Sequence, residues 1–171
     1  RKNDIYAVLT STNMVGAFHW SLYLVVATNN LQDSSTGYKF HATNKIGTAP
    51  WQYECVLWVN PQSEDSMPVT FTKIGRIPDD WDYSYLDYFL SSIPMSTPDT
   101  DRAREPRFTC RVWFREAVRT LHAAEMFVKC ADVDALERDL VIKATAAEYM
   151  RRSIPLPRFL TTNAVDVEGW L

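Results

Sequence analysis

Cysteine and histidine are scarce in this chain of 171 residues, which has three of each. An odd, small number of cysteines excludes a disulfide scaffold, and none of them shows the C-x-x-C spacing typical of a zinc site. We therefore expect a reducing compartment, with a cytoplasmic location, and neither a metal nor another cofactor. With so few histidines and cysteines, each one merits inspection as a chemical group.

A long apolar run is also missing, since no stretch approaches the roughly 20 residues of a membrane-spanning helix. We expect no integral membrane segment, although peripheral contact with a membrane stays open. The net charge of −3 favours no nucleic-acid partner. The first residues show no signal-peptide pattern, but the chain begins at Arg1, so processing at the N-terminus stays open.

Apolar side chains are abundant instead, with 46% hydrophobic and 13% aromatic residues. This composition argues against disorder, and the length suits one domain over residues 1–171 with a sizeable core. In the first half of the chain, aromatic and β-branched runs bounded by turn-forming residues predict strands. The predicted strands cover residues 4–10, 18–28, 38–44, 51–59 and 69–74.

The second half is predicted to be helical, at residues 79–93, 108–130 and 132–152. Thr109 and Asp132 are expected to cap the last two helices, because a side-chain oxygen can accept an orphan backbone N–H. Residues 94–107 are predicted to form a charged, proline-rich loop. Residues 153–171 are predicted to form a C-terminal tail that packs over the surface or adds a last strand. The pattern predicts an α+β fold, in which an antiparallel sheet of about five strands packs against helices.

Two of the three histidines lie on the hairpin predicted from 18–28 and 38–44. If its loop is centred near Asn30, His19 faces His41, and Trp20 faces Phe40. Because strand side chains alternate between faces, both histidines then share one face of the sheet. The sequence therefore predicts a side-by-side pair of imidazoles.

Cys110 follows the predicted cap Thr109, in the first turn of a helix. Backbone N–H groups and the helix dipole favour a thiolate there, and a nearby imidazole can accept the thiol proton. A second polar group can hold that imidazole in the correct tautomer, and the N–H of Cys110 can bind an oxyanion. The candidate catalytic residues are therefore Cys110, His19 and His41. Cys55 lies within a predicted strand and Cys130 near a helix end, so neither combines these features.

The runs "HWSLYLV", "GYKFH" and "CRVWF" resemble the lecithin–retinol acyltransferase-like branch of circularly permuted papain-like cysteine enzymes. The residues that carry the resemblance are His19, Trp20, Tyr23, Gly37, His41, Cys110 and Trp113, in that order along roughly residues 5–125. The resemblance implies a permuted papain-like fold. It also implies that Cys110 is the nucleophile, His19 the base and His41 its polar partner. It further implies an acyl-cysteine intermediate, in a transferase or hydrolase that acts on an ester, thioester or amide.

Alternatives stay open beside this hypothesis. The related PPPDE-type cysteine peptidases also place histidine before cysteine, so peptide or isopeptide cleavage is a second prediction, and the substrate is a small acyl molecule or a peptide. A third alternative is a non-enzymatic binding domain, in which Cys110 is a small core residue and the histidines only pack. The sequence predicts no oligomeric state.

Three arginines, Arg111, Arg115 and Arg119, recur at four-residue intervals on the helix that begins near Cys110. They are expected either to form a solvated face partly paired with Glu116, or to form a docking surface for an acidic or phosphate-bearing substrate. The acidic segment 79–88 is a further candidate partner for them.

Overall fold

The computed structural model describes residues 1–12, 14–29, 34–44, 50–61, 68–124, 128–151 and 157–165. Its strands are β1 (Asp4–Ser11), β2 (Phe18–Asn29), β3 (Ser34–Thr43), β4 (Gln52–Val59), β5 (Pro68–Arg76) and β6 (Arg158–Leu160). Its helices are α1 (Tyr83–Ser91), α2 (Asp99–Arg102), α3 (Cys110–Ala123) and α4 (Val133–Met150).

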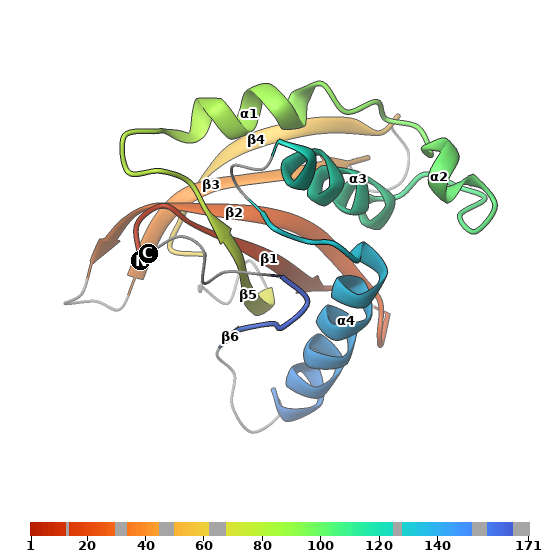
Figure 1. The fold of residues 1–171 in the computed structure, drawn as a ribbon. Helices are drawn as coiled ribbons and strands as arrows, with labels where there is room; N and C mark the ends of the chain where they lie inside the picture. The colour runs from red at the N-terminus through yellow and green to blue at the C-terminus, as the bar shows by residue number, and fades with distance from the viewer. Residues whose placement is uncertain are drawn as a thin grey trace.

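The strands form one sheet in the order β4-β3-β2-β1-β5-β6 (Figure 1). Neighbours from β4 to β5 are antiparallel, and β6 pairs with β5 in parallel. The α+β prediction is confirmed, but the sheet is mixed and, within the described residues, has six strands. The sixth comes from the C-terminal tail, and it can run parallel to β5 because four helices carry the chain back between them.

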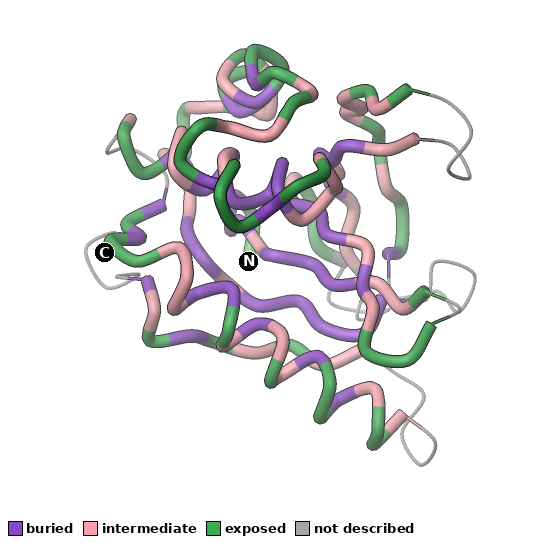
Figure 2. The backbone as a smooth tube through the Cα atoms, turned by 90° about the vertical axis from the view of Figure 1, so that its right-hand side faces the viewer, coloured by how far each residue is buried: buried purple, intermediate pink, exposed green. Residues whose placement is uncertain are grey.

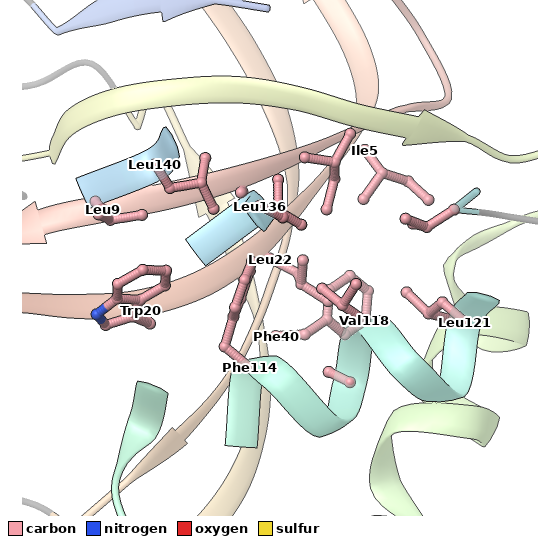
Figure 3. Close-up of a cluster of buried hydrophobic side chains, with 14 of the residues drawn as sticks. Ile5, Leu9, Trp20, Leu22, Phe40, Phe114, Val118, Leu121, Leu136 and Leu140 are labelled. Atoms are coloured by element: carbon pink, nitrogen blue, oxygen red, sulfur yellow. The ribbon is translucent and has the colours of Figure 1, made fainter. Parts of the chain in front are cut away.

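The helices cover one face of the sheet, as Figure 1 shows. Helix α1 packs on β3 and β4, α3 on β2 and β3, and α4 on β1 and β5. On that face Trp20, Leu22 and Phe40 meet Phe114 and Val118 of α3 (Figure 3). Burying each large apolar side chain contributes about 1.5–3 kcal/mol, so this layer holds α3 against β2 and β3.

Burial shows that the central strands are covered on both faces (Figure 2). The central strands are almost continuously buried, whereas α4 alternates between buried and exposed positions along its length. The sheet face away from the helices carries a smaller cluster of buried side chains, formed by Val8, Tyr23, Val25 and Phe71. Strand alternation places His19 and His41 on this second face, with Tyr23.

Gly37 marks a tight contact between β2 and β3. A Cβ atom at this position would lie 2.0 Å from the carbonyl oxygen of Leu24 and 2.8 Å from the ring of Tyr23. No side chain fits at that distance, so the sequence needs glycine here for steric reasons.

The predicted helix caps are confirmed, and some helix bounds are not. Thr109 accepts the N–H of Val112 at 3.3 Å, and Asp132 accepts the N–H of Ala135 at 2.9 Å. Helix α3 ends at Ala123, before the predicted residue 130. The ring of His122, near the end of this helix, accepts the backbone N–H of Cys130 at 3.1 Å.

Helix α2 lies inside the segment predicted to be a loop, and it explains the arginines of α3. Arg115 is 2% exposed and binds Asp101 of α2 together with Asp134 and Glu137 of α4. The prediction of a solvated or substrate-binding arginine face is therefore wrong for Arg115.

The two neighbouring arginines are paired in the same way. Arg119 binds Asp101 at 2.8 Å and Glu116 at 3.0 Å, and Arg111 binds Glu105 at 2.7 Å and Glu137 at 3.0 Å. Their observed partners come from α2, the loop after it, α3 itself and α4, and not from segment 79–88. This arginine network joins α3 to α2 and α4.

Candidate active site

The two histidines lie on neighbouring strands and share a hydrogen bond. Nε2 of His19 is 2.7 Å from Nδ1 of His41, and the rings meet nearly at right angles. The observed register pairs Leu22 with Phe40, so the predicted pairing of Trp20 with Phe40 is wrong by two residues. Because strand side chains repeat every two residues, a shift of two leaves both histidines on the same face. That part of the prediction is confirmed.

The thiol of Cys110 lies at the first residue of α3, beside β2. The pKa of this thiol is raised by burial, while hydrogen bonds from the backbone N–H groups of Trp20, Cys110 and Arg111 act in the opposite direction. Burial outweighs them, so the expected thiolate is not the resting form at neutral pH. The three N–H groups nevertheless provide donors for a negative charge that forms here during a reaction.

Both imidazoles are neutral at neutral pH. Burial, with a smaller effect of the Lys39 ammonium, lowers the pKa of His19 to about 4. Burial, Lys39 and the neighbouring His19 lower the pKa of His41 to about 3. A neutral imidazole keeps a lone pair that can accept a proton. The resting site therefore holds a neutral thiol and neutral histidines.

The backbone N–H of Trp20, the residue after His19, points toward the Cys110 thiol. Within the described part of the chain, the hydrogen bonds include none between the thiol and the His19 ring. His19 projects from the sheet face away from the helices, whereas Cys110 packs against the core on the covered face. No contact between the sulfur and a His19 nitrogen is observed among the described residues, and their expected close approach stays a prediction. Such contacts are often long in a free enzyme and tighten when substrate binds.

Strand β4 adds a carboxylate to this face. Glu54 is the cross-strand partner of His41, and its Oε2 lies 3.7 Å from Nε2 of that ring. Gln52 donates to the other carboxylate oxygen, Oε1, at 3.1 Å. Lys39 lies over the ring of Trp58, 5.0 Å from its centroid. The sequence interpretation missed Glu54, although a single acidic residue in the apolar strand "WQYECVLWV" was a usable signal.

A cavity of about 500 Å³ opens beside the thiol. Its walls include Phe18, Trp20, Trp51 and Val141, with Cys110 and Arg111 at one side. This volume falls in the range of about 300–1,000 Å³ that is usual for small-molecule sites. The lining is mostly apolar, so the cavity can take an apolar group next to the sulfur.

A family model matches residues 4–169, and its description is a family of unknown function, DUF6914. The chain belongs to this family. No curated protein and no solved structure matches it. The DUF6914 match includes every residue of the candidate site, but its description names no activity. The chemistry around Cys110 therefore carries the functional proposal.

The other cysteines of this DUF6914 chain lie in different surroundings. Burial, followed by the carboxylate of Asp87, raises the pKa of Cys55 to about 12, and burial raises that of Cys130 to about 11. His122 lines a separate polar cavity, together with Cys130 and Asp101. It therefore does not serve the Cys110 site, since it lies about three helical turns further along α3.

The described residues include no group of three or more histidine, cysteine, aspartate or glutamate side chains arranged to hold a metal ion. Among the helices in the described ranges, none has the length and apolarity needed to cross a membrane.

Proposed function

We propose that this protein is a thiol-dependent acyltransferase or hydrolase that forms an acyl-cysteine intermediate on Cys110. His19 acts as the base, and His41 holds the His19 ring. The observation that carries this proposal is the surroundings of the Cys110 thiol: backbone N–H groups of Cys110 and Arg111 at the start of α3 and of Trp20 in β2 point toward it, and it lines an apolar cavity. Cys55 and Cys130 have no equivalent surroundings.

The reaction proceeds in two steps. In the first, the sulfur attacks a carbonyl carbon while the thiol proton passes to His19, and the N–H groups stabilise the oxyanion. His19 then gives this proton to the leaving group, which departs and leaves a thioester on Cys110. In the second step, His19 takes a proton from water or an acceptor, which attacks the thioester and restores the thiol. Because the resting thiol is protonated, proton transfer accompanies the attack.

The proposed fold is that of the lecithin–retinol acyltransferase-like branch of permuted papain-like enzymes. Three features support it. The residues occur in the order His19, His41, Cys110; the histidines are hydrogen-bonded on neighbouring strands; and the cysteine begins a helix that packs on the same strands. The apolar cavity favours a small substrate with an apolar acyl group, in an ester, thioester or amide.

Incubation with a short p-nitrophenyl ester, followed by intact mass and peptide mapping, tests this proposal. The expected result is one acyl adduct, on the peptide that contains "RFTCR". Cys110→Ala should abolish the adduct, whereas the matched variants Cys55→Ala and Cys130→Ala should keep it. His19→Ala should slow acylation by about 10²–10⁴-fold, the range for loss of a general base, and His41→Ala by less.

Adduct formation that spreads over all three cysteines, or that survives Cys110→Ala, would contradict the proposal. In that case Cys110 is a packing residue and the chain is a binding domain. An ester, a thioester and an amide with the same acyl group should be compared, because faster acylation by the amide would indicate a peptidase instead.

A further inference from the structure

We propose that Glu54 is a positioning residue that fixes the tautomers of both histidines, so that Nδ1 of His19 is the atom that accepts the thiol proton. This inference rests on the proposed function of Cys110 and assigns a role to a residue outside the Cys110–His19–His41 set.

The placement of Glu54 follows from the strand register. His41 and Glu54 are cross-strand partners on β3 and β4, so their side chains project from the same face of the sheet. Oε2 of Glu54 is the carboxylate oxygen nearest His41, at 3.7 Å from Nε2. Gln52 anchors Oε1 at 3.1 Å, which holds the carboxylate in this orientation. The His41 side chain is 9% exposed and the Glu54 side chain 27%, so solvent only partly screens their interaction.

The proton positions follow from this geometry. At 3.7 Å the Glu54 carboxylate is beyond hydrogen-bond distance of His41, but its negative charge favours the tautomer with the proton on the nitrogen that faces it, Nε2. Nδ1 of a neutral His41 is then an acceptor, and Nε2 of His19, at 2.7 Å, has to donate to it. A neutral His19 with its proton on Nε2 has a free lone pair on Nδ1. Both histidines are therefore held as Nε2–H tautomers.

This arrangement also stabilises the charge that forms during acylation. When Nδ1 of His19 takes the thiol proton, the new imidazolium keeps its Nε2–H hydrogen bond to His41. Glu54 then places a negative charge on the far side of the His41 ring. Lys39 acts in the opposite direction, because its ammonium group lowers the pKa of both histidines. The Glu54 carboxylate also attracts this ammonium.

The test is ¹⁵N NMR of the histidine side chains in the free protein, which reports tautomers without requiring activity. The wild-type protein should show His19 and His41 as Nε2–H tautomers near pH 7. Glu54→Gln should move both rings toward a tautomer mixture, because an amide can also donate to His41. Glu116→Gln, which alters a glutamate paired with Arg119 away from this face, should change neither ring.

Acylation kinetics provide the second readout. Glu54→Gln should lower kcat for ester turnover by at least about tenfold, with KM little changed. The effect should be smaller than the about 10⁴-fold loss seen when the acid of a Ser-His-Asp triad is neutralised, because Glu54 acts through two imidazoles.

A wild-type His41 with its proton on Nδ1, or tautomers that Glu54→Gln leaves unchanged, would overturn the inference. The proposed function fails separately. If no acyl adduct forms on Cys110 but the histidine tautomers still depend on Glu54, the proposed acyl transfer is refuted. The positioning role of Glu54 is then retained.

Discussion

Replacement of Arg115 by methionine should destabilise the protein by about 3 kcal/mol. The Arg115 side chain is 3% exposed, and its guanidinium binds Asp101 at 2.9 Å, Asp134 at 2.6 Å and, more closely still, Glu137. Removing one partner of a buried ion pair usually costs about 3–5 kcal/mol, because a buried charge loses its compensation. The lower end applies here, since Asp101 keeps Arg119 and Glu137 keeps Arg111.

Urea and thermal unfolding measure this loss. For a domain of this size, about 3 kcal/mol corresponds to a fall in Tm of roughly 6–12 °C. The matched control is Arg102→Met, which breaks a pair with Asp99 in which both side chains are largely exposed. Exposed pairs contribute about 0–1 kcal/mol, so this control should scarcely differ from the wild type. An Arg115→Met variant as stable as Arg102→Met would refute the structural role of the arginine network.

The same arginine network predicts how the stability of the fold changes at acid pH. Burial tends to raise the pKa of Asp101, but hydrogen bonds from Arg119 and Arg115 outweigh it and lower this pKa to about 2. Because the pKa of Asp101 is lower in the folded protein than its unfolded value of 3.8, this carboxyl stabilises the fold at any pH above 3.8. The stabilisation is lost as the pH falls from 3.8 through about 2. The stability difference between wild type and Arg115→Met should therefore narrow over this pH range.

Three further predictions concern the sheet and the cavity. Stability should fall as the pH drops from 6.5 toward 4, because His19 and His41 stay neutral in the fold while unfolded histidines bind protons; a double His→Gln variant should flatten this slope in urea titrations, and an unchanged slope would contradict the lowered pKa values. Gly37→Ala should lower the free energy of unfolding, measured in urea, by more than about 1 kcal/mol, since its Cβ would lie 2.0 Å from the carbonyl oxygen of Leu24. An unchanged urea midpoint would show that β2 and β3 can move apart to make room for the Cβ. Val141→Trp should slow acylation by a long-chain ester far more than by an acetyl ester, and equal slowing would place the acyl group outside the cavity.

The sequence by itself determined the local features of this protein. Side-chain oxygens at Thr109 and Asp132 predicted two helix starts, because capping depends on residues three positions apart. The placement of Cys110 in the first turn of a helix followed from the same rule. His19 and His41 were correctly assigned to one face despite a register error of two residues, because the alternation of a strand is unchanged by such a shift.

Only the tertiary structure decided the features that depend on which distant segments meet. Glu54 reaches His41 through the pairing of β3 with β4, and no local pattern specifies that register. Arg115 was expected on a solvated face, but α2 and α4 pack against it and bury it among carboxylates. The protonation state of Cys110 also depended on the tertiary structure. The helix start at Cys110 favours a thiolate, yet burial of the thiol outweighs it, because desolvation depends on every element packed around the sulfur and not on the turn that carries it.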